Sequence, residues 1–199
     1  QTAPAIRATR EIRPVAVKSF GDTVYVFDFG ENMAGVCRLS VQGEKGTKIT
    51  MQHGELQKAN GRVEMGNIDI YYKPLPGLAF QTDTYTLKGE GVETFTPDFT
   101  YHGFQYVEVK SDRPVKLNEE SLTALFVHTA VEPVGTFSCS NELMNKIWKA
   151  TNQSYLSNLH SIPTDCPQRE KNGWTADAHI SIDLALLNFD GIRFYEKWL

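Results

Sequence analysis

The segment 165–179, which reads DCPQREKNGWTADAH, brings several chemically active side chains close together. They are the carboxylates Asp165, Glu170 and Asp177, with Arg169 and Trp174 between them. Carboxylates accept hydrogen bonds from vicinal hydroxyl groups, arginine fixes the orientation of a carboxylate, and an indole covers the apolar face of a sugar ring. The segment therefore carries the side chains that a carbohydrate site needs. The competing interpretation is that a polar loop is only a solvated, charged surface.

Other reactive side chains in the same region give weaker hypotheses. Cys166 with His160 or His179 is a thiol and imidazole pair, but nothing in the sequence orients it for nucleophilic catalysis. A metal site built from these three residues and Asp177 lacks a standard ligand spacing. No strand-elbow pattern for a serine nucleophile is found. We therefore expect neither a metal nor a cofactor.

Two histidines and an aromatic group lie further upstream. His53 and His102 fall in predicted strands, where we expect half-buried, hydrogen-bonded histidines. Four aromatic residues follow one another closely at Phe99, Tyr101, Phe104 and Tyr106. Packing in a core or between domains is the favoured role for these rings, with a platform for sugar as the second possibility.

Helices are expected on both sides of the segment 165–179. Ser140 is the candidate N-cap of a long helix, with Glu142 in its first turn, where the helix dipole favours an anion. Its apolar face is formed by Met144, Trp148, Tyr155 and Leu159. Pro163 and Pro167 break this helix, so the reactive segment begins in a loop.

A second helix is predicted from about Thr175 to Gly191, with an apolar stripe of Ile180, Leu184 and Leu187. A third begins at Ile192 and runs to the end of the chain. So few helices cannot bury these stripes among themselves, so we expect the opening of a larger helical domain. The exposed faces are expected to allow self-association.

The first two thirds of the chain are predicted to be strands separated by Gly and Pro turns. The segments with strand patterning are 23–29, 36–41, 47–53, 81–87, 93–95, 106–109 and 122–128. Residues 58–78 are rich in Gly and Pro and predict a long loop. Many short strands are typical of a sandwich. The expected fold is therefore an antiparallel β-sandwich domain at 1–134, followed by a helical domain fragment at 135–199.

Composition restricts the range of partners. The chain has 199 residues, 41% hydrophobic and 22% charged, with a net charge of −4, which gives no electrostatic case for nucleic acid. Its apolar runs are far too short to cross a bilayer. Three cysteines establish no disulfide framework, and no signal peptide is apparent in residues 1–14, so the compartment stays open.

The order of the motifs resembles one known family. DCPQRE, then GW and an Asp, is similar to the signature of bacterial α-L-rhamnosidases, glycoside hydrolase family 78. Upstream, FDFGENMAG at 27–35, QHGE at 52–55 and FTPDFTYHGFQYVEV at 95–109 look like the β domain that precedes the family's (α/α)6 barrel. The resemblance covers most of the chain in the expected order, and a solvated surface predicts none of that order.

The resemblance implies a role for each residue of the segment. Glu170 matches the family's general acid, placed by its distances of four and seven residues to Trp174 and Asp177, because the spacing before it varies. Asp165 and Asp177 match carboxylates that bind rhamnose hydroxyls. Arg169 and Trp174 match sugar-contacting neighbours, while Lys171 and Asn172 receive no role.

An inverting mechanism follows from the same resemblance. Protonated Glu170 would donate to the glycosidic oxygen while a second carboxylate, expected beyond Leu199, activates water. Crowding by Asp165 and Asp177 and burial beside Trp174 would raise the pKa of Glu170, whereas Arg169 and Lys171 would lower it if they pointed inward. We expect a fragment of a rhamnose-releasing hydrolase that is inactive alone. The alternative is a non-catalytic carbohydrate-binding or structural β-sandwich module.

Overall fold

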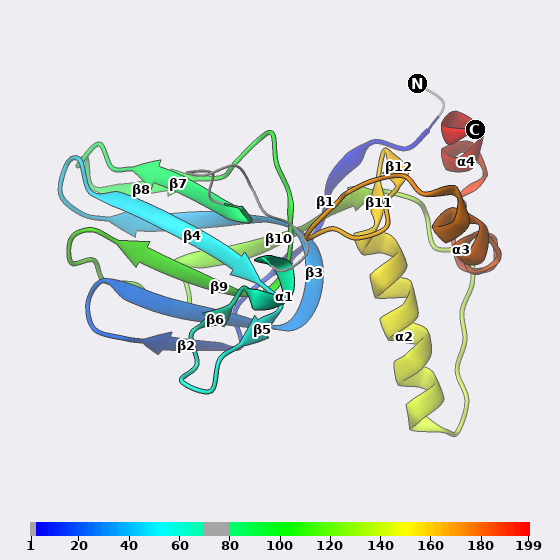
Figure 1. Cartoon of the computed structure of the whole chain (residues 1–199), viewed down its shortest axis with the longest axis horizontal. Coiled ribbons are helices and arrows are strands. Elements are labelled where there is room, and N and C mark those ends of the chain that lie inside the picture. The colour runs from blue at the N-terminus through cyan, green and yellow to red at the C-terminus, as the bar shows by residue number, and fades with distance from the viewer. Residues whose placement is uncertain (1–2, 70–79) are drawn as a thin grey trace.

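The computed structural model describes residues 3–69 and 80–199, in which a β-rich part is followed by helices (Figure 1). The strands are β1 (Ile6–Ile12), β2 (Ala16–Ser19), β3 (Val24–Gln42), β4 (Lys48–Gly54), β5 (Leu56–Gln57), β6 (Val63–Glu64), β7 (Thr82–Thr86), β8 (Val92–Phe95), β9 (His102–Ser111), β10 (Leu122–Thr129), β11 (Leu159–His160) and β12 (Ile162–Pro163). The helices are α1 (Gly66–Asp69), α2 (Glu142–Ser157), α3 (Thr175–Asn188) and α4 (Ile192–Trp198). Among the described residues no helix is long and apolar enough to cross a membrane.

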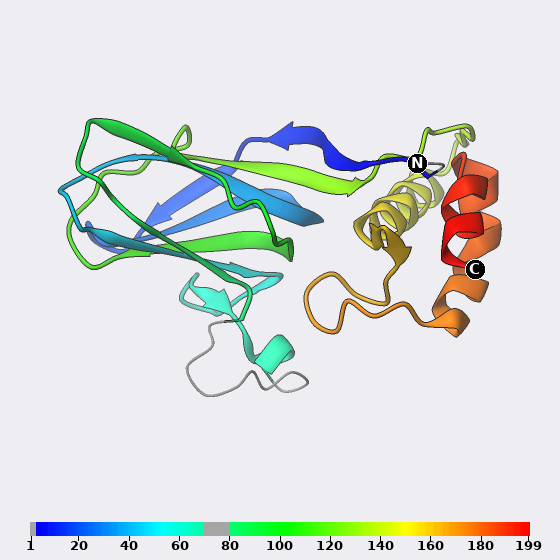
Figure 2. The same ribbon diagram turned by 90° about the horizontal axis from the view of Figure 1, so that it is seen from above.

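The long strand β3 belongs to both layers of the β part. Its first half pairs with β2 and β9, and β9 continues through β4 to β7. Its second half pairs with β10 and β8, and β10 pairs with β1. All of these pairings are antiparallel. The expected antiparallel sandwich is confirmed (Figure 2). The single strand β3 runs through it where two separate strands, 23–29 and 36–41, were predicted.

A glycine lies where β3 changes layer. The pairing of β3 with β9 shifts register between Asp28 and Met33. Gly30 lies inside this shift with φ of +74°, a left-handed conformation that costs glycine little. Its amide donates to Oδ1 of Asp28 (2.7 Å). Gly30 directly follows the predicted strand 23–29, yet it lies in a bulge inside the longer strand β3.

The sandwich core is filled by alternate residues of the two halves of β3. Tyr25, Phe27 and Phe29 point inward from the first half, and Cys37 and Leu39 from the second. Alternation puts side chains with a period of two on one face of a strand, so the two halves meet across a shared core. The segment 56–69 covers the opposite face, where a second cluster gathers around Val26, Val63, Met65 and Ile68. Residues 70–79 of the predicted loop 58–78 lie outside the described residues.

Strands β1 and β2 were missed by the sequence analysis. β1 reads IRATREI, and nearly all of it is exposed because it lies at an edge, pairing only with β10 among the described strands. Arginine side chains on an edge strand keep it from pairing with other molecules. They also break the alternation of apolar and polar residues by which a strand is identified in a sequence.

Helix α2 differs from its prediction at both ends. The N-cap is Asn141 and not Ser140, because the Asn141 side chain accepts from the amides of Leu143 (2.9 Å) and Met144 (3.4 Å). The helix ends at Ser157, before the two prolines, and Leu159 lies in the short hairpin of β11 and β12.

The helical part has a small core of its own. It consists of Val131, Tyr155, Leu159, Ala178, Ala185, Phe189, Phe194 and Tyr195. Helix α3 contributes its alanines, while Leu184 is only partly buried and Ile180 and Leu187 are 81% and 74% exposed. The predicted stripe is therefore left largely uncovered, as expected from so few helices.

Candidate functional site

Most of the reactive segment lies in a loop, 164–174, between β12 and α3, and its last residues lie in the first turns of α3. Hydrogen bonds of Asp165 connect the two ends of the loop. The amide of Asp165 donates to the carbonyl of Asn172 (2.9 Å), and the amide of Asn172 donates to Oδ1 of Asp165 (2.9 Å). The other carboxylate oxygen accepts from the thiol of Cys166 (3.0 Å). Asp165 therefore fixes the shape of the loop that carries it, in addition to any contact with a ligand.

Cys166 is a structural thiol of this loop. Burial raises its pKa, and the hydrogen bond with Asp165 raises it further. Its Sγ accepts the backbone amide of Glu170 (3.4 Å). A thiol that keeps its proton is a poor nucleophile, which argues against the thiol and imidazole alternative.

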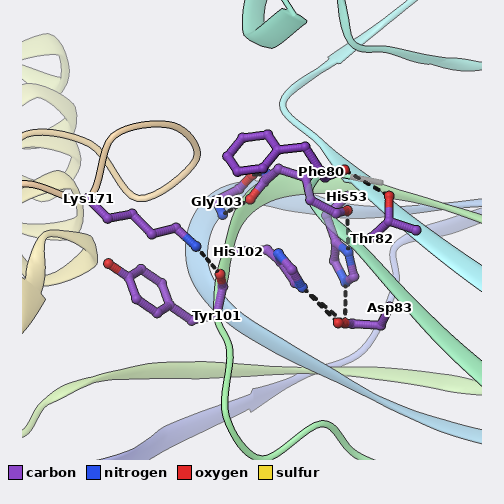
Figure 3. Close-up of polar contacts among 9 residues, drawn as sticks. His53, Phe80, Thr82, Asp83, Tyr101, His102, Gly103 and Lys171 are labelled. Atoms are coloured by element: carbon purple, nitrogen blue, oxygen red, sulfur yellow. Dashed lines mark hydrogen bonds and ion pairs between the residues drawn. The ribbon is translucent and has the colours of Figure 1, made fainter. Parts of the chain in front are cut away.

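Lys171 points from the loop to the β domain, as Figure 3 shows. Its Nζ donates to the carbonyl of Tyr101 (2.5 Å) and lies 4.1 Å from the centre of the Tyr101 ring. Its φ of +56° is left-handed, which residues with side chains rarely adopt. Burial lowers the pKa of Lys171 from 10.5 to about 8, although Asp83 and Cys166 act in the opposite direction. Lys171 thus attaches the loop to the β domain and does not turn toward Glu170.

The ring of Tyr101 connects a third segment to this contact. It stacks on His160 of β11, with 3.6 Å between ring centres and an angle of 7°. Burial lowers the pKa of His160 from 6.5 to about 3 and raises that of Tyr101 from 10.0 to about 12. Both rings are therefore neutral near pH 7. Of the four aromatic residues that seemed to form a group, Tyr101 packs between domains and Phe104 lies in the sandwich core, while Phe99 is exposed.

A glycine lets the loop lie directly on the start of β9. A Cβ at Gly103 would come within 2.9 Å of Cγ of Pro167 and of Cβ of Gln168, closer than such atoms approach each other. The Gln81 side chain holds Gly103 through both backbone groups, donating to its carbonyl (2.6 Å) and accepting from its amide (3.3 Å). The β domain therefore supplies a fixed floor for the loop.

A cavity of about 960 Å³ separates α2 from the loop and the adjacent end of the sandwich. Asp165 and Arg169 line it from the loop side, and Glu31 and Glu55 from the β side. Arg10 closes one part of its wall, donating to Glu31 (3.0 Å) and to Gln153 of α2 (3.1 Å). Charged and amide side chains from three parts of the chain line the cavity beside apolar ones such as Met33, Trp148 and Leu156. This mixture suits a sugar, which has both hydroxyl groups and an apolar ring face.

A second cavity of about 610 Å³ lies between α2 and α3. Asp165 and Asp177 both line it, although twelve positions separate them in the sequence. Its apolar wall includes Tyr155, Ile180 and Leu184. The two carboxylates that the sequence analysis paired are therefore brought to one hollow.

The remaining two residues of the predicted site line neither of these cavities. Glu170 is exposed on the turn of the loop, and Trp174 is 53% exposed at the N-cap position of α3. The expected burial of Glu170 beside Trp174 is not seen among the described residues, because the loop turns Glu170 outward before the helix begins. Asp165 and Asp177 thus face cavities, whereas the carboxyl group of Glu170 faces solvent.

No sequence pattern identified the residues that position the loop. Lys171 and Asn172 received no role, yet they attach the loop to Tyr101 and to Asp165. The one signal available was that Tyr101 and Gly103 fall within the upstream motif 95–109. That motif could have been read as a support for the loop.

Two family models match this chain. The bacterial alpha-L-rhamnosidase concanavalin-like domain matches residues 18–128, and the bacterial alpha-L-rhamnosidase 6 hairpin glycosidase domain matches residues 132–199. Among curated proteins, an alpha-L-rhamnosidase of Formosa agariphila is 36% identical over 202 residues, covering 100% of this chain and 20% of that relative. One of Streptomyces avermitilis is 35% identical over 195 residues, covering 98% and 18%. The chain thus spans about a fifth of the length of these relatives.

Solved structures agree with these matches. The alpha-L-rhamnosidase of Dictyoglumus thermophilum superposes with a TM-score of 0.90 at 43% identity, covering 98% of this chain and 21% of that one. The Streptomyces avermitilis alpha-L-rhamnosidase complexed with L-rhamnose gives a TM-score of 0.87 at 34% identity, covering 100% and 18%. The fold of both parts of the chain is therefore shared with these enzymes.

Proposed function

This chain belongs to the bacterial α-L-rhamnosidase family, and from that premise we propose that it is part of a glycoside hydrolase that releases terminal α-L-rhamnose from rhamnosides. The observation that carries the proposal is the loop 164–174, whose Asp165 lines two cavities, one of them shared with Asp177 of α3, while Glu170 projects from a fixed backbone. The relatives are about five times longer than this chain, so the activity is proposed for a longer enzyme, in which these residues form a β domain and the first part of the helical catalytic domain. We place the boundary between the β domain and the helical domain at residues 134 and 135.

Glu170 is proposed as the general acid. An acid must reach the glycosidic oxygen of a bound substrate, so its carboxyl group has to be accessible while its backbone stays fixed. The exposed Glu170 meets the first condition. Its amide is held by Sγ of Cys166, and its neighbour Lys171 is anchored on Tyr101, which meets the second.

Asp165 and Asp177 are proposed to bind the hydroxyl groups of the rhamnose ring. Both line the 610 Å³ cavity, and ionised carboxylates accept two or more hydrogen bonds each. Arg169, which lines the larger cavity, is proposed as a second polar contact. The half-exposed indole of Trp174 is proposed to cover the apolar face of the sugar.

The proposed mechanism is inversion in a single displacement. Glu170 would protonate the leaving oxygen while a carboxylate outside these 199 residues activates water on the opposite face of the ring. In this proposal the base comes from another part of the helical domain, about 6.5–9.5 Å from the carboxyl group of Glu170. We therefore expect little turnover from this chain by itself.

Replacement of Glu170 by glutamine tests the acid role in the complete enzyme. We expect at least a hundredfold loss of kcat on an alkyl rhamnoside, and a much smaller loss on a dinitrophenyl rhamnoside, whose leaving group needs no protonation. Rhamnose binding, followed by calorimetry, should persist. Glu142→Gln, which changes an exposed carboxylate of α2, is the matched control and should keep the wild-type rate on both substrates.

Two results would contradict the assignment. Equal losses on both substrates would mean that Glu170 does not act as a proton donor to the leaving group. A wild-type rate in the variant would remove Glu170 from the chemistry altogether.

A further inference from the structure

Three buried side chains converge on one point of the β domain, behind the loop 164–174. His53 lies on β4, Asp83 on β7 and His102 at the start of β9, and these strands are adjacent in the order β9, β4, β7. Their exposed fractions are 0%, 9% and 4%. One ligand atom from each lies within 4.8 Å of the others. Figure 3 shows both imidazole rings directed at the carboxylate of Asp83.

The hydrogen bonding of His53 leaves a lone pair directed at the carboxylate. Nδ1 of His53 lies 3.1 Å from the carbonyl oxygen of Gln81, which can only accept, so Nδ1 carries the proton. The His53 side chain is 0% exposed, and such full burial favours the uncharged ring. Its Nε2 is then an acceptor, buried without a hydrogen-bond partner and 3.9 Å from Oδ2 of Asp83. Two buried acceptors facing each other are unfavourable unless a cation lies between them.

His102 approaches the same carboxylate from beside His53. Its Nε2 lies 3.1 Å from Oδ1 and 3.0 Å from Oδ2 of Asp83. The two imidazoles are stacked, with 4.2 Å between ring centres and an angle of 22°, so both Nε2 atoms are directed at Asp83. Nδ1 of His102 is also buried without a hydrogen-bond partner. The cluster thus contains more hydrogen-bond acceptor atoms than the surrounding donor groups satisfy.

We infer that His53, Asp83 and His102 form a binding site for a divalent transition-metal cation of the zinc class, through both Nε2 atoms and a carboxylate oxygen. Tetrahedral zinc with bonds of about 2.0–2.1 Å keeps its ligand atoms about 3.3 Å apart, between the observed 3.0 and 3.9 Å separations. His102 would move its proton from Nε2 to Nδ1, so binding releases no net proton. The carbonyl of Gln81 would hold the His53 ring in the required tautomer, which is the usual second-shell arrangement.

The donor set selects the cation. Two imidazole nitrogens and one carboxylate suit zinc and its neighbours, whereas magnesium and calcium require shells composed of oxygen atoms. The site also lies next to the residues that support the loop, because His102 is flanked by Tyr101, which holds Lys171, and by Gly103, on which Pro167 rests. A cation here would fix three strands under the loop. It would be structural, and the inference does not depend on rhamnoside cleavage.

Metal titration of the untagged, chelator-treated chain tests the inference. Cys139→Ser is used as the background, because this exposed thiol could bind metal by itself. We expect one equivalent of Zn²⁺ to bind by calorimetry. Co²⁺ should give the visible absorption bands of a four-coordinate ion, with water as the fourth ligand beside the three side chains, and Zn²⁺ should then displace the Co²⁺. Asp83→Asn and His53→Gln should each lower the affinity more than tenfold. Mg²⁺ and Ca²⁺ should show no binding.

The control is His128→Gln, which changes another buried histidine whose ring bonds to Thr9 and to the carbonyl of Thr129. It should bind zinc like the background protein. Equal loss of binding in His128→Gln and Asp83→Asn would place the metal elsewhere. Absence of Zn²⁺ and Co²⁺ binding by the folded Cys139→Ser protein would overturn the inference even if the cluster variants fail to fold.

Discussion

At the scale of single residues, Lys171 attaches the loop 164–174 to the β domain, but burial of its charged amine costs free energy. Its amine bonds to Tyr101, but burial lowers its pKa from 10.5 to about 8. Between these values the unfolded chain binds more protons than the folded chain, so raising the pH favours the folded state. We predict that the free energy of unfolding of the wild type rises relative to that of Lys171→Met between about pH 8 and pH 10. Urea denaturation at several pH values measures this, and parallel pH profiles would contradict it.

His160 gives the corresponding prediction in acid. Its pKa is about 3 in the folded protein and 6.5 ordinarily, because burial opposes the charged ring. As the pH falls from 6.5 toward 3 the unfolded chain takes up a proton that the folded chain refuses, so stability is lost. We predict that His160→Phe, which preserves the stack on Tyr101, retains more stability than the wild type over this range. Its thermal midpoint should fall less steeply with decreasing pH, and an equally steep fall would remove His160 from the acid sensitivity.

At the scale of elements, Asn141 caps the first turn of α2, whereas its neighbour Ser140 does not. Asn141 accepts from two amides of the turn, whereas Ser140 is exposed and outside the helix. We predict that Asn141→Ala lowers the free energy of unfolding by about 1 kcal/mol, the usual value of an N-cap, while Ser140→Ala leaves it nearly unchanged. Chemical denaturation of both variants measures the difference. A larger effect at Ser140 would restore the assignment made from sequence.

At the scale of the whole molecule, polar contacts connect the sandwich and the helices, beside the packing of Leu156 of α2 against the sandwich core. Arg10 of β1 donates to Gln153 of α2, whose amide donates to the carbonyl of Asn32 on β3 (3.3 Å). Lys171 and Tyr101 make the second connection. The loop is thus positioned by the β domain as much as by the helices that flank it.

The helical part also exposes apolar side chains on the outside of the molecule. Leu143 and Ile147 on α2 are 64% and 50% exposed, in addition to Ile180 and Leu187 on α3. We predict that the isolated chain self-associates through these faces, with a weight-average mass that rises with concentration in sedimentation equilibrium. Ile180→Lys with Leu187→Lys should reduce the association. Val15→Lys with Val92→Lys, which adds the same charge at exposed positions of the β part, should not. A monomer at all concentrations would exclude self-association.

The sequence by itself determined that a β-sandwich comes first and a helical part follows. Strand alternation predicted most of the sandwich, and the 3.6-residue period predicted the three helices of the C-terminal part, because both patterns are local and repeat along the chain. The reactive loop was likewise visible, since its carboxylates, arginine and tryptophan lie within fifteen consecutive residues.

Only the tertiary structure decided which of these residues meet. Asp165 and Asp177 share a cavity because two helices pack across it, and Glu170 faces solvent because the loop turns at an anchored Lys171. The cluster of His53, Asp83 and His102 could not be found from spacing, because three strands bring together residues that are thirty and nineteen positions apart. Sheet pairing depends on contacts between distant segments, and no local pattern contains that information.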